Sequence, residues 1–249
     1  AAPRIDVVTV TTLAGSDAKL ISIDLGTSFS PTGDGQGDSV VIDGTNGNDP
    51  ITASLVAGAV SIKGLPAQLS IAHVEAIDGI SISGGAGNRS ISVAALPTKA
   101  GQLILVGGAG NDTLTGNLGN NVLNGGDDKD NLNGGGGNDT LTGGGSNDTI
   151  TGGAGNDAIF YTSVLDGLDV VIGFDGNAAG GQDVFNLDFL FDNLGVAEGG
   201  RAGRVSIVDK GATVDIFVDA DGLAGFELAV ATLKSADVVT VGPDILVGT

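Results

Sequence analysis

The sequence contains no cysteine, methionine or tryptophan, and only one tyrosine and one histidine among its 249 residues. Without cysteine the chain has no disulfide, no thiolate metal ligand and no cysteine nucleophile. With one histidine it cannot build a metal site with two imidazole ligands. Ten basic residues stand against 30 acidic ones, for a net charge of −20. Nucleic acid is therefore not an expected partner, because phosphate contacts need lysine and arginine.

Motifs of common catalytic sites are also missing. The sequence has no HExxH, no GxSxG and no GxxxxGK[ST] pattern, so we expect that the protein is not an enzyme. A carboxylate pair for glycoside hydrolysis stays open as a disfavoured alternative, because the aspartates lie in glycine-rich turns. The lone His73 is interpreted as an ordinary surface or packed residue. No apolar run approaches the ~18 residues of a spanning helix, so no transmembrane segment is expected.

What the chain does have is glycine, 45 residues of it, arranged with a period of nine. Residues 107–160 read as six consecutive nonapeptides: GGAGNDTLT, GNLGNNVLN, GGDDKDNLN, GGGGNDTLT, GGGSNDTIT and GGAGNDAIF. Glycine allows tight turns that direct carbonyl oxygens inward, and an aspartate follows at the sixth position of all repeats but one. Calcium takes six to eight oxygens from carboxylates and carbonyls, which is the chemistry of this nine-residue signature. A disordered glycine-rich linker would lack the aliphatic residue that returns every ninth position.

Each repeat ends in a polar, apolar, polar triplet such as residues 113–115, which is typical of a short strand with one side chain inward. The inward residues at the eighth position are expected to stack as the core: Leu114, Leu123, Leu132, Leu141, Ile150 and Ile159.

The pattern resembles the RTX, or hemolysin-type calcium-binding, repeats of proteins exported by type I secretion. The resemblance implies a right-handed parallel β-roll in which two nonapeptides make one turn, and each calcium lies between loops eighteen residues apart. The side-chain ligands that it implies are Asp112, Asp130 and Asp148 in one column, and Asn121, Asp139 and Asp157 in the other. The backbone carbonyl ligands that it implies are those of Gly107, Ala109, Gly125, Asp127, Gly134, Gly136, Gly143 and Gly145. The expected cofactor is Ca²⁺, with several ions, about four or more. The neutral amide of Asn121 should weaken the site that it shares with Asp139.

Six repeats make only three turns, so the flanks must help to shield the core. Upstream, GTNGNDPIT at 44–52 keeps a liganding Asp49, whereas GGAGNRSIS at 84–92 has Arg89 in that place. The Arg89 guanidinium is expected either to replace the ion by pairing with a neighbouring carboxylate or to be exposed. Alternating triplets at 60–62, 69–71, 80–82, 91–93 and 103–105 indicate an irregular β-solenoid over 38–106. Residues 1–37 are expected to form an N-terminal β arm or cap, with strands at 5–12 and 19–24.

Downstream of the roll, residues 161–249 are expected to form a β-rich cap. Residues 169–174 and 182–188 look like the segment that follows the repeats in type I secreted proteases, with the pattern D-x-I-x-D-F and then D-x-I-D-L. Gly173 and Asn186 stand where that pattern has acidic residues. The resemblance implies an uncleaved export signal in this region. A further strand is expected at 212–218, and Asp219 to Gly222 is interpreted as an acidic turn in preference to a calcium loop.

The predicted fold class is therefore all-β, and the predicted location is secreted or extracellular, associated with the cell surface. The first residues carry no basic and apolar leader, so we expect a mature form, a fragment or a chain exported through its C-terminal region. The favoured function is a calcium-locked scaffold that self-assembles as a homo-oligomer or polymer in a surface layer, filament or adhesin, with cell-surface polysaccharide as a further partner. One alternative is the calcium-binding and export module of a larger secreted enzyme or toxin. Another is an ice- or glycan-binding face formed by Thr113, Thr115, Thr149 and Thr151.

Overall fold

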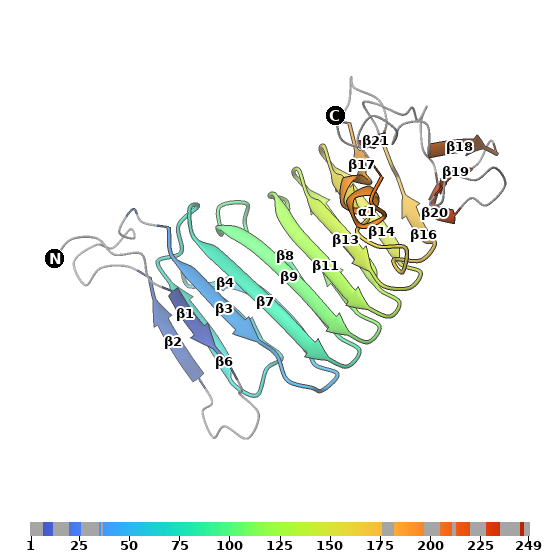
Figure 1. Cartoon of the computed structure of the whole chain (residues 1–249). Coiled ribbons are helices and arrows are strands. Elements are labelled where there is room, and N and C mark those ends of the chain that lie inside the picture. The colour runs from blue at the N-terminus through green and yellow to red at the C-terminus, as the bar shows by residue number, and fades with distance from the viewer. Residues whose placement is uncertain are drawn as a thin grey trace.

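The computed structural model describes residues 7–11, 20–25, 35, 37–175, 182–196, 205–210, 213–219, 228–234 and 245–246. These residues form a long stack of strands in two sheets, with the N-terminal strands at one end and the C-terminal strands at the other (Figure 1). The expected all-β class with parallel sheets is confirmed.

Each strand of the stack belongs to one of two sheets, which we call sheet A and sheet B. Sheet A runs in the order β1 (Val7–Val10), β3 (Ser39–Asp43), β7 (Gly79–Ala86), β9 (Gln102–Ala109), β11 (Asn121–Asp127), β13 (Thr140–Gly144), β15 (Ala158–Phe160), β17 (Val184–Asn186) and β21 (Ile245–Leu246). Sheet B runs in the order β18 (Val205–Asp209), β19 (Thr213–Val218), β20 (Leu228–Lys234), β16 (Asp169–Ile172), β14 (Thr149–Ala154), β12 (Asn131–Gly136), β10 (Thr113–Thr115), β8 (Ser90–Ala95), β4 (Pro50–Val56), β5 (Ala59–Lys63), β6 (Gln68–Ala72) and β2 (Leu20–Asp24). From β7 to β17 consecutive strands alternate between the sheets, so that two strands and their turns make one layer.

Register within the repeats follows the nonapeptide period. Leu114 pairs with Leu132 in sheet B, and Leu123 pairs with Leu141 in sheet A, each eighteen residues along the chain. All six eighth-position side chains are at most 1% exposed, so the predicted core is confirmed. Burial of each such leucine or isoleucine stabilises the fold by about 1.5–3 kcal/mol relative to an exposed side chain.

Glycine at the second position of five of the six repeats allows the close approach of neighbouring layers; the second repeat has Asn117 there. Gly126 has φ +110°, and a Cβ added there would meet the carbonyl oxygen of Gly108 in the layer before it. The left-handed backbone and the contact with that carbonyl both exclude other residues.

The N-terminal half contains an element that the sequence interpretation did not anticipate. All five predicted triplets between residues 60 and 105 lie within strands β5 to β9, but β4, β5 and β6 pair antiparallel. The β4–β5 hairpin turns at Ala57 and Gly58, both with positive φ, as a tight two-residue turn requires.

Aromatic side chains close the core at the C-terminal end of the repeats. Tyr161, Phe174, Phe185 and Phe191 are fully buried, and the rings of Tyr161 and Phe185 stack with centroids 4.9 Å apart. Phe191 belongs to the short helix α1 (Asp188–Asn193), which was not predicted. The predicted strand at 212–218 appears as β19, in an antiparallel sheet with β18 and β20. Of the acidic turn expected at 219–222, only Asp219 lies within the described residues.

Candidate metal centre

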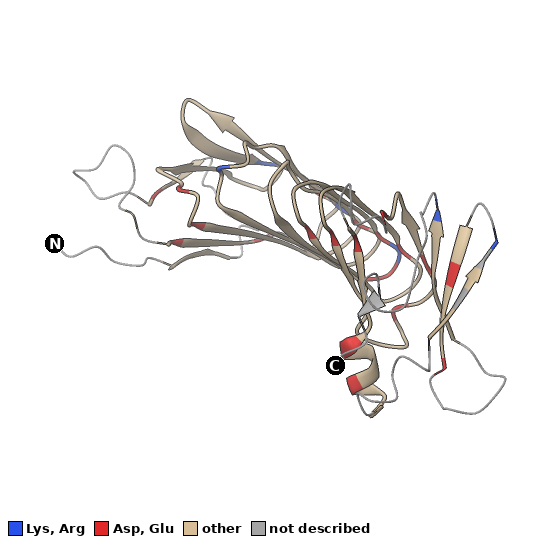
Figure 2. Ribbon diagram, turned by 90° about the horizontal axis from the view of Figure 1, so that it is seen from above, with Lys and Arg blue, Asp and Glu red and all other residues tan. Residues whose placement is uncertain are grey.

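The sixth-position side chains form two buried columns along the turns of the stack, where acidic positions recur (Figure 2). Column B, before the strands of sheet B, contains Asp112, Asp130 and Asp148, and column A, before the strands of sheet A, contains Asn121, Asp139 and Asp157. Each side chain is 1–2% exposed.

One carboxylate oxygen of each aspartate joins neighbouring layers. The backbone N–H of Asp112 donates to Oδ1 of Asp130 over 2.7 Å, and that of Asn121 donates to Oδ1 of Asp139 over 2.7 Å. Asp130 and Asp139 continue the two chains of hydrogen bonds to the next layers, at 2.7 and 2.8 Å. The Oδ1 atoms are therefore satisfied by the protein itself.

The second carboxylate oxygen of each aspartate has no such partner. The Oδ2 atoms that are buried without any hydrogen bond belong to Asp112, Asp130, Asp139, Asp148 and Asp157. A buried ionised oxygen is costly unless a donor or a cation faces it. Buried carboxylate oxygens that lack a hydrogen bond in every layer are expected of a column of cation ligands.

First-position glycines create the space in which these oxygens lie. A Cβ on Gly125 would collide with Oδ2 of Asp130 in the same loop and with the carbonyl oxygen of Gly143 one layer further on. Gly107 and Gly134 show the same convergence of an aspartate Oδ2 and the next first-position carbonyl. The donor set of carboxylate and carbonyl oxygens fits calcium.

The third-position residues show no equivalent convergence. Ala109, Asp127, Gly136 and Gly145 range from buried to exposed. The carbonyl of Ala109 already accepts a hydrogen bond from the N–H of Gly87 over 2.7 Å. Within the described residues no three acidic or histidine side chains gather into a group that could hold a metal. Backbone carbonyls would therefore have to supply most of the oxygens of any cage.

Two aspartates beyond the repeats extend the columns, and the sequence interpretation missed both. Asp169 accepts the N–H of Asp148 over 2.8 Å, and Asp183 accepts the N–H of Asp157 over 3.0 Å. Both are buried. Asp169 begins the short strand β16 and Asp183 directly precedes β17, and both strands contain valine next to the aspartate. That was the available signal, but the spacings of 21 and 26 residues break the period of eighteen.

Burial controls the protonation of the columns. Loss of hydration, with a smaller contribution from the charges of neighbouring aspartates, raises the pKa of Asp130 and Asp139 to about 7. The same cause raises the pKa of Asp148 and Asp157 to about 6 and that of Asp169 to about 7. Column neighbours thus repel one another when ionised, and the charges of Arg89 and Lys129 offset the raised pKa of Asp112 and Asp148 only in part.

Metal-free protein is expected to be more stable in mild acid than at neutral pH. The folded columns hold protons between about pH 4 and 7, whereas an unfolded aspartate with a pKa of 3.8 does not. This contribution to stability is complete below about pH 4 and is lost as the pH rises through 6 to 7. Thermal unfolding in calcium-free buffer should give a higher Tm at pH 5 than at pH 8. With calcium the order should reverse, because protons compete for the ligands. A metal-free Tm that rises from pH 5 to 8 would contradict the assigned pKa directions.

Asn121 differs from the aspartates of column A because its side chain is satisfied within its own loop. Its Nδ2 donates to the carbonyl oxygen of Gly119 and to Oδ1 of Asn117, the latter over 3.0 Å. Its Oδ1 accepts the N–H of Asn117 over 3.1 Å. The amide therefore places a donor among the oxygens of its turn, while its Oδ1, beside Gly116, is already satisfied by the N–H of Asn117.

Arg89 is neither exposed nor paired with a carboxylate through its guanidinium, so those two expectations were wrong. The residue is 4% exposed, its guanidinium donates to backbone carbonyls, and only its backbone N–H donates to a carboxylate, Oδ1 of Asp112, over 2.7 Å. The reason lies in the turn, whose carbonyl oxygens point inward whether or not an aspartate is present. Asp49, in register with Arg89, is half-buried, and its Oδ2 accepts the Thr45 hydroxyl over 2.5 Å.

Fifth-position asparagines form a second interlayer ladder that the sequence interpretation missed. The N–H of Asn111 donates to Oδ1 of Asn88 over 3.0 Å, and the N–H of Asn138 donates to Oδ1 of Asn120 over 2.8 Å. The ladder reaches Asn48 through the N–H of Asn88. It needs no ion, so part of the cohesion between layers is independent of metal.

Comparison with protein families identifies the repeats that form the two columns. Residues 104–132 and 124–159 match the sequence model of the RTX calcium-binding nonapeptide repeat, in four copies. These residues are RTX repeats, and calcium is the ion that repeats of this family bind. Proteins with such repeats are commonly secreted. No curated protein matches the chain. No helix in the described part of the chain is long and apolar enough to span a membrane.

Proposed function

We propose, from the RTX repeats at residues 104–159, that this chain is a secreted calcium-binding structural protein. Its calcium-locked, right-handed β-roll acts as a scaffold that self-assembles at or outside the cell surface. The observation that carries the proposal is the set of buried Oδ2 atoms without partners, repeated layer after layer along the roll. A single ion site would serve a local purpose, whereas a column of sites stabilises an extended structure.

The proposed side-chain ligands are the aspartates of the two columns. Column B supplies Asp112, Asp130 and Asp148, and column A supplies Asp139 and Asp157. Asn121, expected from the sequence as a weaker ligand, is left out because its amide donates to the oxygens of its own turn. The first-position carbonyls of Gly107, Gly125, Gly134 and Gly143 complete the cages, with the third-position carbonyls as further ligands. Asp169 is added as a ligand beyond the repeats, because its Oδ2 lies beside the first-position Gly143 of column B. Asp183 extends column A only by hydrogen bonding, because its Oδ2 already accepts the N–H of Asp175 over 2.9 Å. Asp49 is the least favoured expected ligand, because Thr45 already donates to it. Bound calcium supplies the positive charge that the columns need.

Several features support a scaffold. We propose the division into a β arm (1–37), an irregular solenoid (38–106), the roll (107–160) and a cap with an export signal (161–249), in which each segment has a structural or secretory role. Calcium would also reduce the net charge of −20, so that copies of the chain repel one another less.

Electron microscopy of the purified chain tests this function. In millimolar calcium, the range in which extracellular modules bind the ion, we expect ordered assemblies that a chelator disperses. Magnesium at the same concentration is the control, because it screens charge equally but demands a smaller octahedral cage. A folded but strictly monomeric protein in calcium would contradict self-assembly. It would instead favour the alternative of an export module of a larger secreted enzyme or toxin.

An ice- or glycan-binding face receives no added support. Asn131 stands in register between Thr113 and Thr149, and Asn133 between Thr115 and Thr151, so the threonine ranks are interrupted.

A further inference from the structure

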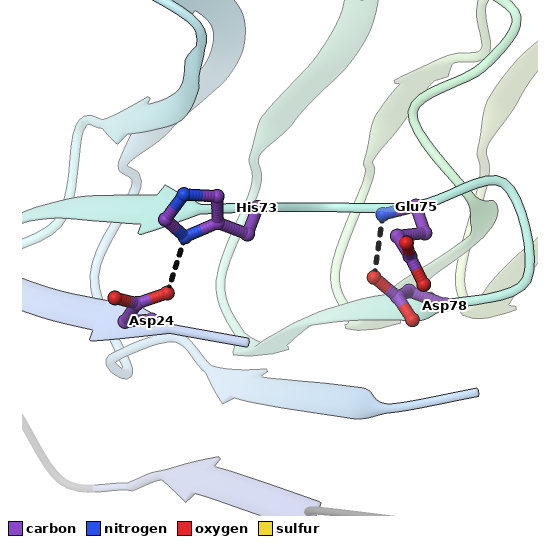
Figure 3. Close-up of polar contacts among 4 residues, drawn as sticks. All are labelled: Asp24, His73, Glu75 and Asp78. Carbon is purple, nitrogen blue, oxygen red and sulfur yellow. Dashed lines mark hydrogen bonds and ion pairs between the residues drawn. The ribbon is translucent and has the colours of Figure 1, made fainter. Parts of the chain in front are cut away.

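Buried acidic groups in the N-terminal half are satisfied by protein donors, unlike those of the columns. Asp78, 1% exposed, accepts the N–H of Asp38 at Oδ1 over 3.0 Å. Its Oδ2 accepts the N–H of Glu75 over 2.6 Å (Figure 3). In the same view His73 contacts Asp24 over 2.5 Å, which links β2 to the turn after β6. In the described chain, unpartnered buried carboxylate oxygens occur only from Asp112 onward.

Column B begins on a positive charge that belongs to the chain. Arg89 is the register partner of Asp112 in the layer before it, because Ser90 pairs with Thr113. Its guanidinium donates to the carbonyl oxygens of Thr45 and of Ala86, the latter over 2.6 Å. A third carbonyl oxygen, that of Gly87, lies 3.4 Å from Nη1. The guanidinium therefore joins the turn at 84–89 to the turn at 44–49.

The position of the Arg89 side chain matches that of the aspartate oxygens in later layers. A Cβ on Gly84 would lie 3.0 Å from Cδ of Arg89 and would collide with the carbonyl oxygen of Gly107. A Cβ on Gly107 would likewise collide with Oδ2 of Asp112 and the carbonyl oxygen of Gly125. The cationic side chain of Arg89 thus lies beside Gly84 in the place where, one layer later, the unpartnered Oδ2 of Asp112 lies beside Gly107.

Column A also begins on nitrogen donors. Nδ2 of Asn117 donates to the carbonyl oxygens of Pro97 over 3.2 Å and Leu96 over 3.3 Å, which belong to the preceding turn. Its Oδ1 accepts Nδ2 of Asn121 over 3.0 Å. In the preceding layer of sheet A, the register partner of Asn121 is the apolar Leu103. Both columns are therefore closed at the same end by side chains that donate to carbonyls.

We infer that Arg89 and the Asn117–Asn121 amide pair stand in for calcium at the N-terminal ends of the two columns. Residues 37–106 then fold without the ion and form the template on which the calcium-dependent layers assemble. The inference rests on the proposed calcium ligation by the columns. It assigns the boundary between metal-free and metal-dependent layers to three residues of this chain.

Hydrogen exchange of the full chain, followed by mass spectrometry, tests the template. When calcium at 100 times its dissociation constant is removed, amides of β10 to β15 should lose about 100-fold in protection for each ion released. Amides of β3 to β8 should keep their protection. Loss of protection across β3 to β8 as well would overturn the inference and leave the proposed function standing. A wild-type chain whose exchange calcium does not alter anywhere would reject both.

Arg89→Asp separates an ion substitute from a merely structural arginine. It restores the sixth-position carboxylate, so native mass spectrometry should count one more bound calcium than in the wild type. Protection of β4 and β8 should become calcium-dependent. Lys63→Asp, an exposed site on β5 with the same charge change, is the matched control and should leave both readouts unchanged. An unchanged calcium count in folded Arg89→Asp would overturn the role of Arg89.

Asn121→Asp provides an independent test within column A. It should also add one calcium, because it replaces the donor amide with an acceptor in line with Asp139. The variant keeps Arg89 and the template intact, so it tests the boundary even where Arg89→Asp fails to fold. A calcium count equal to that of the wild type would overturn the substitution of calcium by the amide pair.

Discussion

Removal of calcium from the full chain is expected to abolish most of the β structure of residues 107–160. At pH 8 the buried aspartates, whose pKa values lie at about 6 to 7, are ionised and repel one another without a counterion. At 100 times its dissociation constant, each calcium stabilises the fold by about 2.7 kcal/mol, so about four ions together contribute as much as the stability of a typical domain. Far-UV circular dichroism during chelation measures the loss.

The expected loss is partial, and this distinguishes it from complete unfolding. The signal from the layers before Gly107 should remain and should disappear only on heating. Readdition of calcium should restore the spectrum, whereas magnesium should not, because the cages are built from many carbonyl oxygens. A spectrum unchanged after exhaustive chelation would show that calcium does not hold the roll together.

Asp139→Asn is expected to change calcium affinity and metal-free stability in opposite directions. The asparagine can still accept the N–H of Asn121, which now donates to Oδ1 over 2.7 Å. It replaces the unpartnered Oδ2 with a donor, as Asn121 already does one layer earlier. Calcium affinity at this site should fall at least about 10-fold, since even supporting residues contribute that much. The metal-free chain should gain stability at pH 8, because a buried carboxylate with a pKa of about 7 is removed.

Asp128→Asn is the matched control. It removes the same charge two residues before a column aspartate, at an exposed fourth position. Asp128 has φ +71°, which asparagine tolerates better than alanine does. Calorimetric titration should show an affinity close to that of the wild type, and the metal-free Tm should change little. Equal losses in the two variants would mean that overall charge, and not ligation, governs binding.

Residues whose roles repeat locally could be predicted from the sequence. The eighth-position leucines and isoleucines are buried as expected, because a period of nine puts one aliphatic side chain inward on every strand. Neighbouring layers are identical in length within the repeats, so Asp112 lies beside Asp130 after eighteen residues. The proposed ligands within the repeats follow from the same spacing of eighteen residues, and the calcium measurements above test them.

Residues whose roles depend on distant partners could not be predicted in this way. Asp169 and Asp183 join the columns after insertions of three and eight residues, which the stacking of strands absorbs in turns. The antiparallel β4–β6 segment and helix α1 carry no periodic signal.

By itself the sequence determined the repeat, its length, its buried aliphatic stack and the family of residues 104–159. Each of these follows from local spacing, because turn geometry and strand alternation act over nine residues. Only the tertiary structure decided how the columns end. Arg89 reaches the carbonyl oxygen of Thr45 across 44 residues, and Asn117 reaches that of Leu96 across 21. Such a hydrogen bond forms because folding brings a donor close to an inward-pointing carbonyl of another turn. The spacing of residues within one repeat does not specify which turn lies there.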